Sequence, residues 1–326
     1  MNRLIILFSF LVFFIATEVN AENKKLSARA EANDANGDGL LQKNGAKYQV
    51  KANFDAIDCD KNSGLDGAEI RRFFSGIGCT NQVAGANIYH KKNYPTGPGP
   101  FPAIIALHTS GGFQSTNTLI ENFRSETWVK AGYAWYAPNF FAKHGITTAT
   151  RMDAFKEYRE DIEKELAAII TLMKADPKID SKNIFAVGFS NGGFWTSFLA
   201  GEGIVTAAAS HYGVWRASMG RWQNPYPAAY FSSKSSPLLA LHGDGDSTQK
   251  LKFFELAWSL IDDTPKIERH IYEGAGHAWD CFPSFPGLKK ICTNNFEAPN
   301  REVTNDALKR TLAFLRSMRN NVILSS

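Results

Sequence analysis

Cysteine and histidine are scarce in this chain, and a strong excess of charge of one sign is missing. Four cysteines and seven histidines occur among 326 residues, and no two cysteines have the C-x-x-C spacing of zinc or dithiol redox sites. Lysine and arginine total 36 against 32 acidic residues, which gives a net charge of +4. The basic residues are scattered and are not interleaved with aromatic residues, so nucleic-acid binding is not expected.

Long apolar runs are also missing after the first sixteen residues. Arg3 precedes an apolar run at 4–16, and Val19-Asn20-Ala21 places small residues at the two positions that a signal peptidase reads. The run is too short to span a bilayer, which requires about 20 apolar residues. We therefore predict a signal peptide at 1–21, no membrane span after its cleavage, and a secreted or periplasmic protein.

Export makes disulfide bonds plausible for the four cysteines, because oxidising compartments preserve them. Four cysteines allow three pairings. The two pairs that are closest in sequence, Cys59–Cys79 and Cys281–Cys292, are the predicted ones. The alternative is four buried thiols.

The remaining sequence divides into a short polar segment and a long segment of alternating elements. Residues 22–83 carry turn-rich acidic loops, and residues 84–326 begin with an extended stretch that ends in a Gly/Pro cluster. Apolar strands then alternate with amphipathic helices, of which 153–174 and 303–318 are the clearest. The candidate strands are 103–107, 133–137, 184–189, 207–211, 238–241 and 270–272. This alternation predicts an α/β fold with a mostly parallel sheet that helices cover on both faces.

The segment Gly188-Phe189-Ser190-Asn191-Gly192 fits the pattern G-x-S-x-G and lies between a predicted strand and a predicted helix. A strand, a sharp turn and a helix form a nucleophile elbow. The turn holds the serine backbone in a strained conformation, so that the hydroxyl projects above the sheet edge. The N–H of the following residue, Asn191, can then bind an oxyanion.

A serine nucleophile needs a base that takes its proton and a carboxylate that orients the base. Asp244 and Asp246 both follow the predicted strand 238–241 and both qualify as the carboxylate. His277 follows the last predicted strand in a glycine-containing loop and is the predicted base. The other histidines after Ser190 lie in or beside predicted strands and are expected to be packed side chains: His211, His242 and His270.

The first predicted strand ends in a loop of small residues, His108-Thr109-Ser110-Gly111-Gly112. Backbone N–H groups at such a position can stabilise a developing alkoxide. The N–H of Ser110 or that of Gly111 would act together with the N–H of Asn191.

In combination these motifs identify residues 85–318 as similar to the dienelactone hydrolase family of α/β-hydrolases. The resemblance rests on five stretches: 108–112, 132–133, 188–193, 242–246 and 276–277. It implies an α/β-hydrolase fold and a triad of Ser190, Asp246 and His277, with Asp246 preferred to Asp244 by its place in a G-x-x-D pattern. Dienelactone hydrolases use cysteine as nucleophile, and serine stands here. This departure moves the expected substrate from dienelactone to carboxylic esters in general.

Two acidic loops near the N-terminus resemble the calcium loops of EF-hands, which supply hard oxygen ligands around a tight turn. The loop 58–69 has oxygen donors at positions 1, 3, 5, 9 and 12, but serine replaces the usual glycine at position 6. The loop that begins at Asp34 has three donors and lacks a carboxylate at position 12, where Gly45 stands. The predicted calcium ligands are Asp58, Asp60, Asn62, Asp66, Glu69, Asp34, Asn36 and Asp38. Residues 22–83 are therefore predicted to form a small helical EF-hand module.

The sequence as a whole predicts an exported serine hydrolase that cleaves small-molecule carboxylic esters through an acyl-enzyme. Ser110 and Asn191 would supply the oxyanion hole, no cofactor is expected for the chemistry, and calcium would be structural or regulatory. Two alternatives remain at this point. One is a thioesterase or peptidase with the same triad, and the other is a calcium-dependent binding protein with an inactive hydrolase domain.

Overall fold

The computed structural model describes residues 26–58, 62–67, 69–70, 90–215, 231–259, 267–295 and 297–319. The chain divides into two compact units, Met1–Gln82 and Val83–Ser326. The predicted signal peptide and the predicted Cys59–Cys79 pair lie outside the described residues. None of the helices in the described ranges combines the length and the apolar character that crossing a bilayer requires.

The described part of the N-terminal unit contains short helices and a two-stranded ribbon around a small apolar core. Its elements are α2 (Ala28–Glu31), β1 (Leu41–Gln42), α3 (Tyr48–Ala52), α4 (Phe54–Ile57) and β2 (Gly64–Leu65). Strands β1 and β2 are antiparallel, and Leu41 pairs with Leu65. The buried residues of this core are Leu26, Leu41, Ala46, Phe54, Ile57 and Leu65. The paired leucines occupy position 8 of the two predicted calcium loops, so the ribbon joins those loops through their apolar residues.

The C-terminal unit is built on a seven-stranded sheet in the order β3-β5-β4-β6-β7-β8-β9. Strand β3 is antiparallel to β5, and every other neighbouring pair is parallel. The strands are β3 (His90–Asn93), β4 (Phe101–Leu107), β5 (Ala134–Pro138), β6 (Ile179–Phe189), β7 (Ala207–His211), β8 (Leu238–Gly243) and β9 (Ile267–Tyr272). The predicted mostly parallel sheet is thus confirmed.

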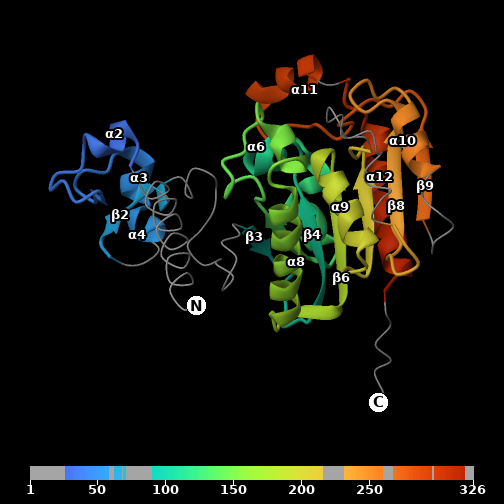
Figure 1. Ribbon diagram of the computed structural model, residues 1–326, viewed down its shortest axis with the longest axis horizontal. Helices are drawn as coiled ribbons and strands as arrows, with labels where there is room; N and C mark the ends of the chain where they lie inside the picture. The colour runs from blue at the N-terminus through green and yellow to red at the C-terminus, as the bar shows by residue number, and fades with distance from the viewer. Residues whose placement is uncertain are drawn as a thin grey trace, which may run out of the picture. The chain divides into compact units, whose positions relative to one another are not determined.

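Helices cover both faces of this sheet because its strands are apolar on both sides. The helices are α6 (Gly112–Leu119), α7 (Ser125–Lys130), α8 (Arg159–Ala175), α9 (Asn191–Gly201), α10 (Leu251–Trp258), α11 (Lys289–Asn295) and α12 (Arg301–Ser317), with 3-10 turns η1 (Glu121–Phe123), η2 (Arg151–Phe155) and η4 (Pro286–Leu288). In β4, Ile105 and Leu107 face the core with α8, α9 and α10, whereas Ile104 and Ala106 face the core with α6, α7 and α12. Figure 1 shows α8 and α9 in front of the sheet and α12 behind it.

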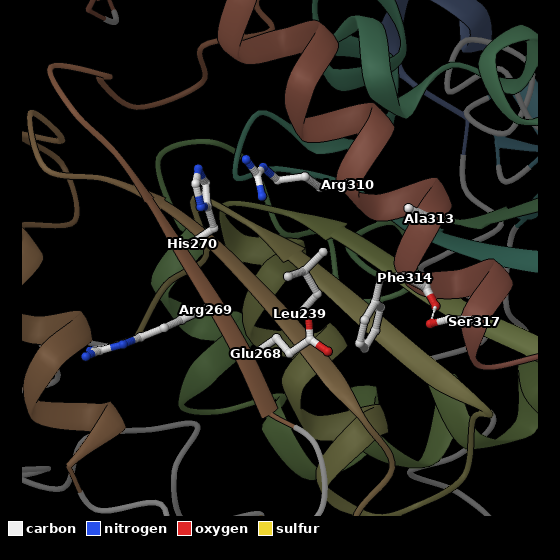
Figure 2. A pocket seen from close by; sticks show the side chains of 8 residues that line it. All are labelled: Leu239, Glu268, Arg269, His270, Arg310, Ala313, Phe314 and Ser317. Carbon is white, nitrogen blue, oxygen red and sulfur yellow. Dashed lines mark hydrogen bonds between the residues drawn. The ribbon is translucent and has the colours of Figure 1, made fainter.

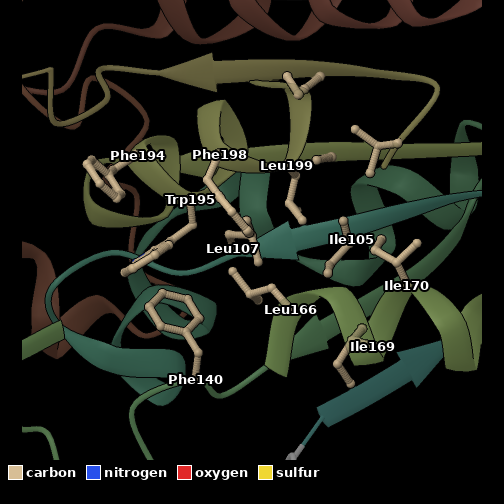
Figure 3. Packing of buried hydrophobic residues seen from close by; sticks show 14 of the residues in the cluster. Ile105, Leu107, Phe140, Leu166, Ile169, Ile170, Phe194, Trp195, Phe198 and Leu199 are labelled. Carbon is tan, nitrogen blue, oxygen red and sulfur yellow. The ribbon is translucent and has the colours of Figure 1, made fainter. Parts of the chain in front are cut away.

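Helix α9 is the most deeply placed helix of the described chain, since all eleven of its residues are buried. Figure 3 shows its side chains Trp195 and Leu199 packed among Leu107 of β4 and Leu166 of α8. A helix enclosed by a sheet and another helix has little freedom to shift, because protein interiors are close-packed. The residue that precedes α9, Ser190, therefore sits on a rigid support.

One predicted helix starts later than expected, and one strand was not predicted. The helix predicted at 153–174 begins at Arg159, after the separate turn η2. Phe155 lies in that turn and packs against Phe194 and Trp195 of α9, with ring centroids 4.8 and 5.8 Å apart. This anchoring holds the turn out of line with α8. Strand β3 was not predicted, because the polar sequence His-Lys-Lys-Asn lacks an apolar strand pattern.

Candidate active site

Ser190 lies on a strained turn between β6 and α9. Its backbone has φ +52° and ψ −111°, which is a costly conformation for a residue with a side chain. Three hydrogen bonds hold this turn. The Ser190 carbonyl accepts the N–H groups of Gly193 at 2.9 Å and Val214 at 3.1 Å, and the Ser190 N–H donates to the carbonyl of His211 at 3.1 Å. The predicted elbow is therefore present, with Ser190 at the carboxyl end of a central strand.

The two glycines of the G-x-S-x-G motif are required by close backbone approaches. A Cβ at Gly188 would lie 2.1 Å from the carbonyl oxygen of Gly192, and one at Gly192 would lie 2.1 Å from the carbonyl oxygen of Leu107. Real Cβ atoms do not come this close to backbone oxygens. Glycine thus lets α9 start directly above β6 and beside the end of β4.

A continuous chain of hydrogen bonds joins Ser190, His277 and Asp246. The Ser190 Oγ lies 2.9 Å from His277 Nε2, and His277 Nδ1 lies 2.7 Å from Asp246 Oδ2. All three residues are buried, with exposed fractions of 7%, 3% and 2% for Ser190, His277 and Asp246. They follow the ends of three different strands, and the structure brings together the three residues that the motifs and the family resemblance had selected.

Asp246, rather than Asp244, faces the base. The second oxygen of Asp246 accepts the N–H groups of Thr248 at 2.8 Å and Gln249 at 2.7 Å, which fixes the orientation of the carboxylate. Asp244 is exposed and accepts the N–H of Gly274 at 2.6 Å. Both aspartates therefore connect the loop after β8 to the loop after β9, but Asp246 alone of the two contacts the imidazole of His277.

A buried tyrosine and aspartate lie behind His277, and sequence reasoning missed them. The ring of Tyr212 meets the imidazole of His277 edge to face, with centroids 5.0 Å apart. The Tyr212 hydroxyl donates to Asp280 Oδ1 at 2.6 Å, and the side chain of Asp280 is fully buried. Burial raises the pKa of Asp280 to about 6. The only sequence signal was an aspartate that follows Trp279 and precedes Cys281.

The two predicted oxyanion-hole residues lie side by side. The Asn191 side-chain amide donates to Ser110 Oγ at 3.4 Å and accepts a hydrogen bond from Trp195 Nε1 at 3.0 Å. Asn191 is the first residue of α9, so its N–H has no partner in a preceding helical turn. This arrangement leaves the start of α9 facing the loop that follows β4.

The loop after β4 favours Ser110 over Gly111 as the second donor. The Gly111 N–H donates to Thr109 Oγ1 at 3.2 Å, whereas the Ser110 N–H donates to none of the described residues. The hydroxyl of Thr116 in α6 accepts the Thr109 N–H at 3.0 Å and donates to the Gly112 carbonyl at 2.8 Å. Thr116 therefore ties this loop to the helix that follows it.

The other buried histidines near the site are packed side chains. His211 Nε2 lies 3.0 Å from Thr311 Oγ1, and His242 Nε2 lies 2.8 Å from the carbonyl of Gln249. Burial lowers the pKa of His211 to about 3 and also lowers the pKa of His242. Both imidazoles are consequently neutral near pH 7, and neither touches Ser190.

Three carboxylates of the loop that begins at Asp58 are buried in the small N-terminal unit. Asp58, Asp66 and Glu69 have exposed fractions of 6%, 5% and 2%. The Asp58 carboxylate accepts the N–H groups of Asn62 and Ser63 at 3.2 and 3.0 Å, and Ser63 has φ +69°. Serine at position 6 thus adopts the left-handed conformation that glycine usually takes there. Asp60 lies outside the described residues.

The loop that begins at Asp34 is exposed, and a side-chain amide satisfies its oxygens. Gln42 Nε2 donates to Asn36 Oδ1 at 2.8 Å, to Asp38 Oδ1 at 3.1 Å and to the carbonyl of Leu40 at 2.7 Å. The Asp34 carboxylate accepts two backbone N–H groups of its own loop. Oxygens of two predicted ligands, Asn36 and Asp38, and the Leu40 carbonyl therefore converge on one amide nitrogen.

A cavity of about 350 Å³ lies elsewhere in the C-terminal unit. It is lined by Leu239, Glu268, Arg269, His270, Arg310, Ala313, Phe314 and Ser317. Figure 2 shows His270 and Arg310 close together on one side of it, while Arg269 points away. Leu239 and Glu268 lie near the starts of β8 and β9, whereas Asp246 and His277 follow the ends of these strands. The cavity is therefore separate from the triad.

Known structures share the fold of this chain at low sequence identity. A candidate dienelactone hydrolase of Klebsiella pneumoniae is 19% identical with a TM-score of 0.55, and the alignment covers 71% of this chain and 94% of that one. A dienelactone hydrolase-like promiscuous phosphotriesterase from metagenomic libraries is 16% identical, with a TM-score of 0.53 and coverages of 72% and 94%. Esterase 2 of Thermogutta terrifontis, solved after phosphoramylation by tabun, is 14% identical, with a TM-score of 0.50 and coverages of 73% and 92%.

A family match covers most of this chain. Comparison with curated proteins finds no match. Residues 89–318, which include the elbow and the loops after β4, β8 and β9, match the dienelactone hydrolase family. That range spans most of the chain and nearly all of the C-terminal unit, and so this chain belongs to the dienelactone hydrolase family.

Proposed function

We propose that this member of the family is an exported serine esterase that cleaves small-molecule carboxylic esters. The observation that carries the proposal is the hydrogen-bond chain from Ser190 through His277 to Asp246, on a strained elbow. This combination is the arrangement by which a serine hydroxyl becomes a nucleophile. The structural neighbours described as an esterase and as a promiscuous phosphotriesterase are compatible with attack on ester-like groups.

The proposed reaction begins with attack of Ser190 Oγ on the ester carbonyl carbon while His277 Nε2 accepts the hydroxyl proton. Asp246 keeps His277 in the tautomer whose Nδ1 carries a proton, and it stabilises the imidazolium that forms. The N–H groups of Asn191 and Ser110 bind the oxyanion. The C–O bond to the alcohol then breaks, and the alcohol leaves with the proton from His277. Water cleaves the acyl-enzyme by the same steps, which regenerates the Ser190 hydroxyl.

Serine in place of the cysteine expected for a dienelactone hydrolase favours carboxylic esters in general over dienelactone as the substrate. A serine alkoxide must be generated at the moment of attack, because a free hydroxyl is a weak nucleophile. The short contact between Ser190 Oγ and His277 Nε2, 2.9 Å, couples proton removal to that attack.

Hydrolysis of nitrophenyl acetate, butyrate and octanoate by the mature protein tests the proposal. The wild type should be active, and Ser190→Ala should lower kcat by at least about 10⁴-fold because the nucleophile is gone. A fluorophosphonate probe should label the wild type and spare the variant. Hydrolysis that survives Ser190→Ala would refute the proposal. Activity on thioesters or peptides alone would favour the alternative hydrolases, and absent labelling would favour a binding protein.

We also propose export through a signal peptide at 1–21, with a secreted or periplasmic mature protein. A disulfide joins Cys281 and Cys292, both buried, and such bonds persist in oxidising compartments. This bond is the second of the two predicted pairs. Mass spectrometry of the protein recovered from an exporting host should give a mature chain that begins at Glu22. A chain that retains Met1 in that fraction would refute cleavage.

Calcium binding by the N-terminal unit is a further proposal. The residues Asp58, Asn62, Asp66 and Glu69 are oxygen donors suited to Ca²⁺, and the carboxylates of Asp58, Asp66 and Glu69 are buried. Bound calcium would tie the loop to the helix that follows. The exposed loop with Asp34, Asn36 and Asp38 fits less well, since Gln42 already satisfies its oxygens, and we propose weaker binding there.

Calorimetric titration of the mature chain with calcium distinguishes the two loops. We expect one tight site, lost in Glu69→Gln, and a weaker site that Asp34→Asn removes. The matched control is Glu31→Gln, which alters a carboxylate of α2 outside both loops. Titration without heat or with no change in Glu69→Gln would contradict calcium binding at the Asp58 loop. Parallel esterase assays with calcium and with EDTA show whether the metal affects catalysis.

A further inference from the structure

Glu297 holds together the two loops that carry the base and its orienting carboxylate. It lies in the short linker between α11 and α12. Its Oε2 accepts the backbone N–H of His277 at 2.8 Å, and its Oε1 accepts the backbone N–H of Ser247 at 2.9 Å and also the Ser247 hydroxyl. Ser247 directly follows Asp246. One carboxylate thus contacts both the base itself and the neighbour of the aspartate.

The surrounding chain is built to bring Glu297 to this position. A Cβ on Gly276 would lie 2.0 Å from the Cβ of Glu297, so glycine before the base allows the glutamate to pass. The Asn300 N–H donates to the carbonyl of Trp279 at 2.8 Å, which keeps the linker alongside the His277 loop. The disulfide Cys281–Cys292 closes the segment between His277 and Glu297. Through these contacts the chain lies close to His277 again after α11.

The side chain of Glu297 carries a negative charge, which favours the hydrogen bonds that it accepts from the two loops. Burial opposes ionisation, but the hydrogen bonds from Ser247 and His277 prevail and lower the pKa of Glu297 below its usual value. The carboxylate is therefore ionised at the pH where an esterase works. An ionised carboxylate has two acceptor oxygens, and here each accepts from a different loop.

We propose that Glu297 is a positioning residue for the hydrolytic reaction, which fixes the Asp246 loop against the His277 loop and so keeps the imidazole aligned with Ser190. This inference rests on the proposed esterase function. It requires no contact between Glu297 and the substrate. Misplacement of a catalytic group by about 1 Å costs on the order of 100-fold in rate, so a residue that sets this distance affects catalysis strongly.

Glu297→Gln is the test, because the amide keeps the shape of the side chain and loses one acceptor oxygen. One of the two loops then faces an NH₂ group instead of an oxygen. We expect kcat for nitrophenyl butyrate to fall roughly 10- to 100-fold, with KM changed less than about threefold. Rates are expressed per site titrated with a fluorophosphonate, which removes any unfolded fraction from the comparison. Ser247→Ala, which removes one of the three donors, should give a smaller loss.

Glu302→Gln is the matched control, since Glu302 is an exposed carboxylate in the first turn of α12 and belongs to neither loop. It should retain kcat within about threefold. The positioning role is wrong if Glu297→Gln has the same kcat per titrated site as the wild type, so that its activity falls only with the number of titrated sites. Inactive wild type or active Ser190→Ala would instead overturn the proposed esterase function, so the two failures are distinguishable.

Discussion

Replacing Asp246 by asparagine changes the tautomer of the base without changing its shape. In the wild type, Asp246 Oδ1 accepts the N–H groups of Thr248 and Gln249, and Oδ2 accepts from His277 Nδ1. Two backbone donors require the oxygen of an asparagine on their side, so its NH₂ group must face His277. The Nδ1 atom then has to accept a hydrogen bond, and the proton moves to Nε2. His277 would donate to Ser190 Oγ and could not take its proton.

The magnitude follows from the loss of general-base catalysis in an otherwise intact site. We expect kcat to fall on the order of 10⁴-fold, equivalent to about 5 kcal/mol of transition-state stabilisation, with KM nearly unchanged. Stopped-flow hydrolysis of nitrophenyl butyrate, together with the rate of fluorophosphonate labelling, measures both acylation and turnover. The melting temperature of Asp246→Asn should change little, because the side-chain oxygen of the amide keeps the two backbone hydrogen bonds.

The refuting result is equally specific. A loss smaller than about 10-fold would show that Asp246 does not set the tautomer of His277. A comparable loss in Asp244→Asn would show that the variant acts by disturbing the loop rather than the proton. The second outcome is not expected, because Asp244 bonds Gly274 and is exposed.

Three further changes test the packing around the site. Burial raises the pKa of Asp280 from 3.8 to about 6, so the wild type has its full stability relative to Asp280→Asn below pH 3.8 and loses about 3 kcal/mol of it as the pH rises through 6. Urea unfolding of both proteins at pH 4 and pH 7.5 measures this loss. The same difference in unfolding free energy between the two proteins at both pH values would contradict it. Gly192→Ala should cost about 3 kcal/mol or more, because its Cβ meets the Leu107 carbonyl at 2.1 Å, whereas Gly287→Ala, in open space, should stay within about 0.5 kcal/mol. The double change Cys281→Ser and Cys292→Ser should lower the free energy of unfolding by about 3 kcal/mol, as expected for a closed loop of this length, and an unchanged urea midpoint would refute the estimate.

The sequence predicted those features whose signals are local. The elbow at Ser190, the acidic turn after β8 and the glycine-flanked His277 each combine a strand end with a short motif, and the structure joins them as expected. Periodicity located most strands for the same reason. It placed the start of α8 too early, because Phe155 continues the helical spacing although its ring belongs to the α9 contact. Strand β3 escaped prediction because an edge position, rather than its polar sequence, gives it a partner.

Contacts that align the triad could not be predicted, since each joins segments that are distant in sequence. Tyr212 approaches His277 from the end of β7, and Glu297 returns to it from beyond the disulfide. Neither residue belongs to a motif, and an isolated glutamate in a polar linker is usually solvated. The glycines of the motifs were recognised in the sequence, but the contacts that require glycine at these positions could not be seen there. Position 276 requires glycine because the side chain of Glu297 packs against it. Position 243 requires glycine because a Cβ there would lie 2.1 Å from the carbonyl oxygen of Ala275.

The base is the part of the triad that most needs such support. Ser190 is fixed by a buried helix, and Asp246 is fixed by two hydrogen bonds from its own turn. His277 instead sits in a loop whose next residue, Ala278, has φ +55°, an unfavourable conformation outside glycine. A loop under strain relaxes unless tertiary contacts hold it. Tyr212 on one side, Glu297 at the backbone and the disulfide beyond provide those contacts, so loss of any one of them should affect turnover more than it affects substrate binding.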